Sequence, residues 1–417
     1  MNQYLIEGGH KLSGEVEVKG AKNLALKVLA GCILIDEEIT IDNVPEIGDV
    51  LRMIEILKDS GTKIEKIKDG KYSICTKSVS KTQLDTKLAQ SLRASIVLSG
   101  PLLARLKEVK ITKPGGCPIG QRPIDMFLAG FKALGAEIIE EENFFVIKAN
   151  KLRGANFIFT RVSVTGTETL IMLATLTPGK TILKNCAMEP EISSLAQWLN
   201  DCGAKINGAG TPTIIIEGVE KLNGRDLTIM PDRIETGTFV IMGLLTGNSL
   251  KINNCEPARL ETFLAMIKKV GGVFEIGNDY LLTKQVKKFK ATDLITHEYP
   301  GFPTDLQAPF TLLMTQAQGT SLIHDPIFEG RLFFTDKLNQ MGANIIMCDP
   351  HRVIVNGPTK LYGKKVDSPD LRAGMTLILA GLIAEGQTTI DNVYQIERGY
   401  ENIAERLQQI GAKIKII

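Results

Sequence analysis

The sequence predicts an α/β protein of two domains, each built from three copies of one β-α-β-α-β-β module. Three observations carry this prediction. A glycine that can end a helix recurs six times, at intervals of 68 to 74 residues. Upstream of each glycine lies a segment that is apolar on almost every side of a helix. Short strands of alternating character, such as TIDNV, TILKNC, LKINNC, SLIHD and TTIDNV, follow these apolar segments.

The repeated glycines end amphipathic segments such as ISSLAQWLNDC and RLFFTDKLNQM. They are Gly61, Gly135, Gly203, Gly271, Gly342 and Gly411. Each can adopt the left-handed conformation that terminates a helix. The apolar helices are LALKVLAGCIL, SIVLSGPLLA, TLIMLATL, GTFVIMGLL, APFTLLMTQA and GMTLILAGLIA. We expect the apolar helices to lie inside each domain and the amphipathic helices outside.

A shorter repeat, Lys-Leu-x-Gly, indicates how the modules are joined. It stands between short strands at 151–154, 221–224 and 360–363, and also at 11–14, where no module precedes it. The sixth module lacks a closing hairpin. We therefore expect the N-terminal strands to complete the last module. The predicted domains are residues 21–230, which carry a loop at 113–123, and residues 1–20 with 231–417, joined by two strands that act as a hinge.

Composition excludes several classes of protein. The chain has 417 residues, of which 49 are basic and 47 acidic, and a net charge of +2. This balance argues against a dedicated nucleic-acid binder. No apolar run reaches the roughly 18 residues of a membrane span, and the N-terminus does not resemble a signal peptide, so we expect a cytoplasmic protein that binds neither nucleic acid nor membrane.

Cysteine and histidine usage indicates neither a disulfide framework nor a metal centre. The seven cysteines include no CxxC pair, and the four histidines have no ligand at metal-binding spacing. We expect most cysteines to be reduced core residues. Neither common nucleotide-binding glycine motif occurs. No cofactor and no metal are expected.

One loop combines a thiol with fixed positive charge. The segment KPGGCPIGQRPID, residues 113–125, contains too many glycines and prolines for a helix or a central strand. Lys113 and Arg122 flank Cys117 and would stabilise a thiolate or hold an anionic substrate. These residues leave two readings open: Cys117 is reactive, or it is an inert cysteine buried in a tight turn.

Polar residues recur where the apolar helices begin. They stand in the segments Lys22-Asn23, Arg93, Ser163-Val164-Thr165, Asp232-Arg233, Thr304-Asp305 and Asp370-Leu371-Arg372, in which Val164 and Leu371 are the apolar members. Helix N-termini together with lysine and arginine bind anions, which predicts a doubly anionic substrate if these ends converge. The alternative is that the aspartates are helix caps and the arginines their surface partners. Arg331 and Arg398 are further candidates at the starts of outer helices.

These motifs resemble those of the UDP-N-acetylglucosamine enolpyruvyl transferases, a branch of the EPSP synthase superfamily. The resemblance spans the whole chain and rests on GAKN (20–23), LRAS (92–95), PGGCPIGQRP (114–123), PDRIETGTF (231–239), FPTD (302–305), IFEGR (327–331), DLRAG (370–374) and RGYE (398–401). It implies the family's fold, a two-domain inside-out α/β barrel that closes over its substrate. It also implies transfer of enolpyruvyl from phosphoenolpyruvate to the 3-hydroxyl of UDP-N-acetylglucosamine, the first committed step of peptidoglycan precursor synthesis, and thus a role in cell-wall biogenesis, cell shape and cell division.

The resemblance assigns roles to particular residues. Cys117 would donate a proton and could carry a phospholactoyl adduct, which also implies inhibition by fosfomycin. Asp305 would be the base, and Lys22, Arg122 and Arg398 would be catalytic cations. The implied contacts to phosphoenolpyruvate are Lys22, Asn23, Cys117, Arg122, Arg331, Asp370, Leu371, Arg372 and Arg398. The implied contacts to the UDP-sugar are Asn23, Arg93, Arg122, Pro123, Ile124, Asp125, Met126, Arg161, Val162, Ser163, Val164, Thr165, Asp305, Ile327 and Phe328.

Three departures from the family pattern concern the nucleotide side. Phe127 stands where many members have histidine, Thr165 and Gly166 stand where many have Gly-Ala, and Val97 stands where many have tryptophan. Two rival functions stay open: a 5-enolpyruvylshikimate-3-phosphate synthase-like transferase, against which the cysteine loop argues, and a catalytically silent binding or regulatory paralogue, against which the presence of Cys117, Asp305 and Lys22 argues.

Overall fold

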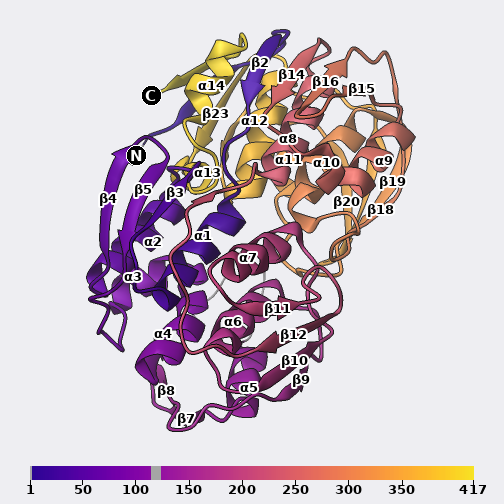
Figure 1. Ribbon diagram of the computed structural model, residues 1–417. Helices are drawn as coiled ribbons and strands as arrows, with labels where there is room; N and C mark the ends of the chain where they lie inside the picture. The colour runs from indigo at the N-terminus through magenta and orange to yellow at the C-terminus, as the bar shows by residue number, and fades with distance from the viewer. Residues whose placement is uncertain (1, 114–123) are drawn as a thin grey trace. The chain divides into compact units, whose positions relative to one another are not determined.

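The computed structural model describes residues 2–113 and 124–417, and they form two compact units. The middle unit contains residues 20–113 and 124–230, and the terminal unit contains residues 2–19 and 231–417. Figure 1 follows the chain from the indigo N-terminus to the yellow C-terminus. The predictions made for Cys117, Arg122 and Pro123 fall outside the described residues.

Each unit has three apolar helices at its centre, as the sequence predicts. In the middle unit these are α1 (Lys22–Gly31) with η1 (Cys32–Leu34), η2 (Arg93–Leu98) with α4 (Ser99–Leu106), and α6 (Val164–Thr175). In the terminal unit they are α8 (Arg233–Leu245), η4 (Thr304–Leu306) with α10 (Gln307–Thr315), and α12 (Leu371–Ile383). Every residue of α8 from Arg233 to Leu244 is buried, which confirms that these helices lie inside.

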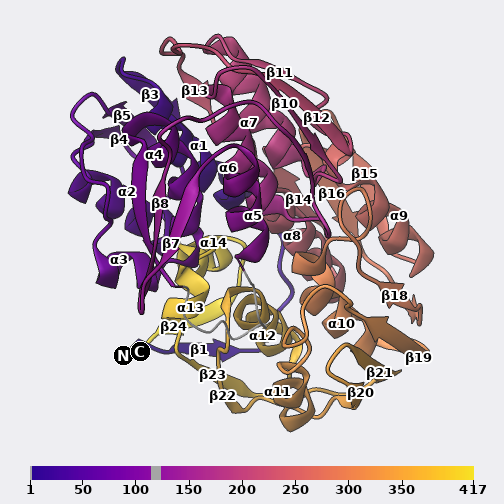
Figure 2. The same ribbon diagram turned by 90° about the horizontal axis from the view of Figure 1, so that it is seen from below.

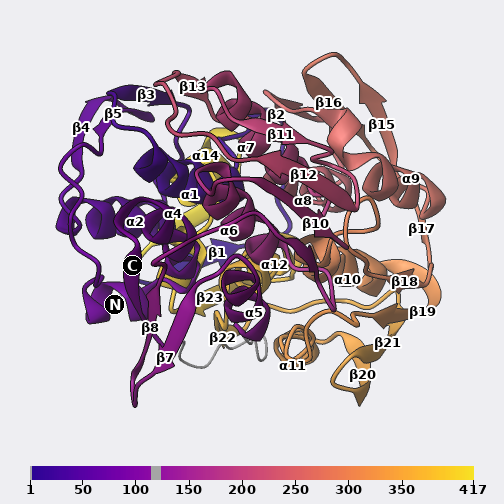
Figure 3. The same cartoon turned by 60° about the horizontal axis from the view of Figure 1, so that its bottom comes forward.

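The amphipathic helices bury one side only. They are α2 (Gly48–Asp59), α5 (Asp125–Ala133), α7 (Pro190–Asp201), α9 (Glu261–Lys269), α11 (Thr335–Gln340) and α14 (Ile403–Gln409). Figure 3 shows α6 among α4, α5 and α7, and α6 contacts all three. Two residues after each amphipathic helix stands a predicted glycine, with φ between 94° and 106°. Side chains rarely adopt this left-handed backbone, so the predicted helix ends are confirmed.

Short elements complete the helical part of the described chain. They are α3 (Thr86–Ser91), η3 (Pro257–Leu260) and α13 (Tyr394–Glu397). Among the described residues no helix is long and apolar enough to cross a membrane.

Three sheets surround the helices of the middle unit. Their strand orders are β13-β3-β5-β4, β6-β8-β7 and β11-β12-β10-β9. The strands are β3 (Ile39–Asp42), β4 (Lys63–Lys68), β5 (Lys71–Cys75), β6 (Glu108–Thr112), β7 (Glu137–Glu140), β8 (Phe144–Lys148), β9 (Asn156–Ile158), β10 (Lys180–Lys184), β11 (Lys205–Asn207), β12 (Thr213–Glu217) and β13 (Leu227–Thr228). Because β13 pairs in parallel with β3, the end of the third module joins the sheet of the first.

Three sheets also build the terminal unit. Their orders are β15-β16-β14-β2, β17-β19-β21-β20 with β18 also on β19, and β22-β23-β1-β24. The strands are β1 (Tyr4–Glu7), β2 (Gly14–Glu17), β14 (Leu250–Asn253), β15 (Val273–Ile276), β16 (Tyr280–Lys284), β17 (Phe289–Lys290), β18 (Leu294–Ile295), β19 (Ala317–His324), β20 (Asn344–Asp349), β21 (Arg352–Gly357), β22 (Lys365–Asp367), β23 (Gln387–Asp391) and β24 (Lys413–Ile416).

The two N-terminal strands belong to different sheets of the terminal unit. Strand β1 lies between β23 and β24 and is antiparallel to both, so it supplies the missing hairpin strand of the sixth module (Figure 2). Strand β2 instead pairs in parallel with β14 of the fourth module. The expectation that both strands complete the last module is therefore wrong for β2. The physical reason is that each Lys-Leu-x-Gly segment leads into a strand that pairs with another module, as β13 and β22 also do.

The cysteines of the described chain are free thiols. Cys32, Cys186, Cys202 and Cys255 are buried, in agreement with the prediction that most are core residues. Burial raises the pKa of Cys186 and of Cys255 to about 12, which makes both thiols poor nucleophiles.

Candidate active site

In the terminal unit, two buried arginines meet on the carboxylate of Asp305. Arg331 Nη2 donates to Asp305 Oδ1 at 2.8 Å. Arg372 donates from Nε and Nη2 to Asp305 Oδ2 at 3.2 and 3.1 Å. The side chains of Arg331 and Arg372 are 5% and 4% exposed, and that of Asp305 is 25% exposed. The reading of the arginines at the inner-helix starts as surface partners is therefore wrong for Arg372.

The aspartates at the helix starts do not all play one role. Asp232 accepts from the amides of Ile234 and Glu235, and Asp370 accepts from the amides of Arg372 and Ala373. Both are therefore N-caps, as the structural alternative expected. Asp305, which stands inside η4, instead pairs with arginines that come from two other segments of the chain.

Electrostatics holds the Arg372 guanidinium firmly in its charged form. Burial alone would lower the pKa of Arg372, but the Tyr400 hydroxyl and the carboxylates of Asp305 and Asp232 outweigh it and raise that pKa. Arg331 also has an unsatisfied hydrogen-bond donor, because its buried Nε–H has no acceptor among the described residues. Such a buried donor favours a bound acceptor.

Asp325 ties together the two segments that carry Asp305 and Arg331. This fully buried carboxylate accepts from the Thr304 hydroxyl at 2.5 Å and from the amides of Ile327 and Phe328 at 3.0 and 3.3 Å. The Arg331 guanidinium lies 5.1 Å from the centre of the Phe328 ring. The turn that precedes α11 is therefore fixed directly against the start of η4.

The RGYE segment approaches the start of α12. A side chain on Gly399 would lie 2.6 Å from Leu371 Cδ1, so glycine permits this approach. Half-buried Arg398 donates to Gln395 Oε1 at 3.1 Å. Tyr400 accepts from Arg372 Nη1 at 3.1 Å. Arg398, Leu371 and Arg372 are thus neighbours within the terminal unit.

In the middle unit, Lys22 begins α1 and is buried. Its Nζ lies 2.6 Å from Asp49 Oδ2, a residue in the first turn of α2. Asn23 follows on α1 and is half-buried. Deeper in the same helix, Lys27 Nζ lies 3.3 Å from Glu168 Oε2 of α6. Complete burial raises the pKa of Glu168 to about 8, against the opposing effect of Lys27.

The remaining candidates of the middle unit stand at the starts of other helices. Arg93 is the first residue of η2 and is half-buried. Ser163 caps α6, with its Oγ accepting from the Gly166 amide at 3.1 Å. Exposed Arg161 lies 3.2 Å from the carboxylate of Asp125, which begins α5.

Sequence comparison places this arrangement among known proteins. The profile of the family EPSP synthase (3-phosphoshikimate 1-carboxyvinyltransferase) matches residues 6–407. The chain belongs to the EPSP synthase family. UDP-N-acetylglucosamine 1-carboxyvinyltransferase from Koribacter versatilis is 43% identical over 100% of this chain and 97% of its own length. The enzyme of that name from Desulforapulum autotrophicum is 42% identical over 100% of this chain and 99% of its own length.

Structural comparison agrees with this family. The enolpyruvyl transferase NikO from Streptomyces tendae superposes with a TM-score of 0.90 at 22% identity, over 100% of this chain and 98% of that chain. EPSP synthase from Acinetobacter baumannii superposes with a TM-score of 0.75 at 19% identity, over 100% of both chains. These likenesses confirm the predicted fold, the inside-out α/β architecture of six modules.

Within this family fold, the departures from the family motifs lie mainly in the core. Phe127 and Val97 are buried in the hydrophobic core of the middle unit, together with Ile124 and Met126. Val162, Val164 and Thr165 are half-buried around the start of α6. Phe127 therefore has a packing role, whatever the nucleotide contacts are.

Sequence reasoning missed three residues that shape the site. Asp49 pairs with Lys22, Asp325 anchors the turn before Arg331, and Tyr400 contacts Arg372. Tyr400 stood inside the RGYE motif and could have been found from that neighbourhood. Asp49 and Asp325 carry no local signal, because their partners are distant in the sequence. No cluster of metal-ligating side chains occurs among residues 2–113 and 124–417.

Proposed function

We propose that this protein transfers the enolpyruvyl group of phosphoenolpyruvate to the 3-hydroxyl of UDP-N-acetylglucosamine and releases phosphate. The proposal is carried by the full-length identity of 42 to 43% with two enzymes named for this reaction. The convergence of Arg331 and Arg372 on one carboxylate supports it, because the donor substrate carries two anionic groups. The reaction needs no cofactor, and its product enters peptidoglycan synthesis.

The phosphoenolpyruvate subsite is proposed to use cations near the starts of inner and outer helices. Arg331, Arg372 and Arg398 belong to the terminal unit, and Lys22 belongs to the middle unit. The Nε–H of Arg331, which has no acceptor among the described residues, could donate a hydrogen bond to an anionic oxygen of the substrate. Asn23, Arg122, Asp370 and Leu371 complete the proposed set. Charge-assisted hydrogen bonds to arginine are strong enough to offset desolvation of the substrate anions.

Cys117 and Asp305 are proposed as acid and base. Cys117 gives a proton to carbon 3 of the enol while the sugar oxygen attacks carbon 2, which yields a tetrahedral ketal. Asp305 takes the proton of the sugar hydroxyl. The ketal then loses phosphate from carbon 2 and a proton from carbon 3, and this elimination restores the double bond. A phospholactoyl adduct on Cys117 is part of the same proposal.

The ion pairs of Asp305 bear on its role as a base. A carboxylate held by two guanidinium groups accepts a proton poorly, since both cations favour its charged form. When a substrate anion binds Arg331 and Arg372, it neutralises part of the positive charge that stabilises the Asp305 carboxylate. Asp305 is then a better acceptor for the hydroxyl proton. Substrate binding and base activation are thereby coupled in one cluster.

The acceptor subsite is proposed from the motifs that the chain shares with the family. The proposed contacts to the UDP-sugar are Asn23, Arg93, Arg122, Pro123, Ile124, Asp125, Met126, Arg161, Val162, Ser163, Val164, Thr165, Asp305, Ile327 and Phe328. Ser163 and its neighbours stand at the N-terminus of α6, where backbone amides suit a diphosphate. We also propose that residues 21–230 and residues 1–20 with 231–417 are the two domains, and that the enzyme is cytoplasmic.

One acceptor experiment tests the function. Phosphate release from phosphoenolpyruvate is measured with UDP-N-acetylglucosamine and, separately, with shikimate 3-phosphate. We expect release with the UDP-sugar only. Release with shikimate 3-phosphate alone would assign the protein to the sister enzyme, and absence of release with either acceptor would overturn the proposal of catalysis.

Cys117 variants test the acid. Cys117→Ala should lose turnover and labelling by fosfomycin, because the thiol is the proposed proton donor and the site of alkylation. Cys117→Asp should keep turnover and resist fosfomycin, since a carboxylic acid can also give the proton. Full activity of Cys117→Ala would remove Cys117 from the mechanism.

A further inference from the structure

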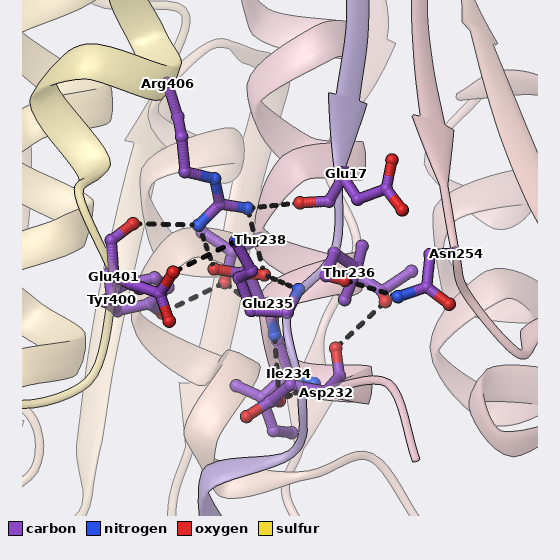
Figure 4. A network of polar contacts seen from close by, with 12 residues as sticks. Glu17, Asp232, Ile234, Glu235, Thr236, Thr238, Asn254, Tyr400, Glu401 and Arg406 are labelled. Carbon is purple, nitrogen blue, oxygen red and sulfur yellow. Dashed lines mark hydrogen bonds and ion pairs between the residues drawn. The ribbon is translucent and has the colours of Figure 1, made fainter. Parts of the chain in front are cut away.

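Tyr400 is buried between an arginine of the proposed site and the first turns of α8. The residue is 1% exposed. Its hydroxyl lies 3.1 Å from Arg372 Nη1 and 3.3 Å from Thr238 Oγ1. Figure 4 shows Tyr400 beside Thr238 within the polar network of the terminal unit. Tyr400 is thus surrounded by protein and contacts a nitrogen of Arg372 that does not bind Asp305.

The direction of each hydrogen bond at Tyr400 follows from its neighbours. The Thr238 hydroxyl donates its single proton to the Ile234 carbonyl oxygen at 2.8 Å, so Thr238 Oγ1 can only accept from Tyr400. Arg372 has donors and no acceptor. Tyr400 must therefore accept from Arg372 and donate to Thr238. The order of donation is Arg372 to Tyr400 to Thr238 to the backbone of α8.

This relay fixes the plane of the Arg372 guanidinium. Nε and Nη2 of Arg372 point to Asp305 Oδ2, and Nη1 points to Tyr400. Contacts on two edges prevent the group from pivoting about the Asp305 edge alone. Burial raises the pKa of the Tyr400 hydroxyl, which keeps the donor proton in place, although Arg372 acts in the opposite direction.

We propose that Tyr400 is a positioning residue for Arg372. It holds the guanidinium in the orientation that receives the anion of phosphoenolpyruvate, with Thr238 holding the Tyr400 hydroxyl in turn. The kinetic part of this inference rests on the proposed function. The geometric part concerns anion binding by Arg372 and can be tested without turnover, using inorganic phosphate as the probe.

The decisive variant is Tyr400→Phe, which removes only the hydroxyl. Loss of a hydrogen bond to a charged group should lower kcat/KM for phosphoenolpyruvate by about 10-fold or more. KM for UDP-N-acetylglucosamine should change less than about twofold, because the relay serves the anion subsite. Phosphate affinity, measured by isothermal titration calorimetry, should fall by about 10-fold.

The control is Tyr72→Phe, since Tyr72 is also buried and its hydroxyl donates to Glu46 at 2.8 Å in the middle unit. It should leave both kinetic constants and phosphate affinity at wild-type values. If Tyr400→Phe matches Tyr72→Phe in these measurements and differs only in thermal stability, Tyr400 is merely structural and the inference is overturned.

Thr238→Val provides a second variant in case Tyr400→Phe does not fold. It removes the acceptor of the Tyr400 proton and should lower kcat/KM for phosphoenolpyruvate by about threefold, with a parallel loss of phosphate affinity. In the Tyr400→Phe background the same substitution should have no further kinetic effect. Additive effects would contradict the relay. If the wild-type protein binds phosphate but has no turnover, the proposed function is overturned. The effect of Tyr400→Phe on phosphate affinity would still test the positioning role of Tyr400.

Discussion

The buried pair of Arg406 and Glu235 should make the stability of the terminal unit sensitive to the loss of either partner. Arg406 donates to Glu235 Oε1 at 2.7 Å and Oε2 at 3.1 Å, and also to the carbonyl oxygens of Glu17 and Glu401 (Figure 4). Its side chain is 9% exposed and that of Glu235 is 4% exposed. Arg406 therefore joins α14 to α8 and to the last residue of β2.

Arg406→Met isolates the polar part of this interaction, because methionine keeps a long apolar stem in contact with the Phe239 ring. The substitution leaves Glu235 with the Lys19 amide as its remaining donor among the described contacts, at 2.8 Å. It also removes a donor from two backbone carbonyl groups. Removing one partner of a buried pair destabilises proteins by about 3–5 kcal/mol, so we expect a loss of that size in the free energy of unfolding.

The single tryptophan allows unfolding of the middle unit to be followed separately. Trp198 lies in α7 of the middle unit, so its fluorescence reports that unit, whereas far-UV circular dichroism reports both. In urea, Arg406→Met should shift a circular-dichroism transition and leave the fluorescence transition in place. Arg105→Met is the matched control, since Arg105 donates to the Ile33 carbonyl and to Thr76 Oγ1 in the middle unit. It should shift the fluorescence transition.

Two outcomes would refute this reasoning. A loss below about 1 kcal/mol for Arg406→Met would mean that the pair behaves like an exposed one. Equal movement of both transitions would contradict the assignment of the effect to the terminal unit. The double variant Glu235→Met with Arg406→Met should be less destabilised than the sum of the single variants, because the double variant leaves no unpaired buried charge.

Three further predictions concern single positions. Glu168 has a pKa of about 8 in the folded protein against 4.5 for an ordinary glutamate, so the folded state binds more protons between these values and stability falls as pH rises. Glu168→Gln should remove a slope of up to about 1.4 kcal/mol per pH unit from the Trp198 unfolding transition, and an unchanged slope would contradict the raised pKa. Gly20→Ala should destabilise the middle unit by about 1–3 kcal/mol or more, because the new Cβ would lie 1.8 Å from the Asn43 carbonyl oxygen; wild-type stability in urea would show that this contact relaxes freely. Asp305→Asn should lower kcat by about 100-fold or more and tighten phosphate binding, since Arg331 and Arg372 lose their counter-charge; calorimetry that shows weaker phosphate binding would reject that account.

The repeat could be predicted because its signals are local. A glycine such as Gly411 ends a helix through its own φ, and an apolar helix such as α12 shows its burial in its own composition. Pairing between distant strands has no such signal. The parallel register of β2 with β14 joins residues more than 230 positions apart, and only the analogy with other Lys-Leu-x-Gly segments would have predicted it.

The candidate site shows the same division between local and distant information. Helix caps at Asp232 and Asp370 follow from residue type and position. The partners of Asp305 do not, because Arg331 lies 26 positions further along the same module and Arg372 lies 67 positions away in the next one. The resemblance to a family suggested these residues as a set, while the contacts of Tyr400 and Asp325 emerged only from the three-dimensional structure.

The aspartate at the start of the inner helix has different partners in the three modules of the terminal unit. In α8 and α12 the aspartate precedes the first helical residue, so its carboxylate accepts from backbone amides of the first turn. In η4 the equivalent acid, Asp305, is the second helical residue, and Pro303 occupies the position before the helix. From that place the carboxylate meets Arg331 and Arg372 instead of the backbone. The position of the acid within the helix therefore decides whether backbone amides or arginines hold it. A substrate anion that competes for those arginines would act most directly on Asp305, because backbone amides hold the carboxylates of Asp232 and Asp370.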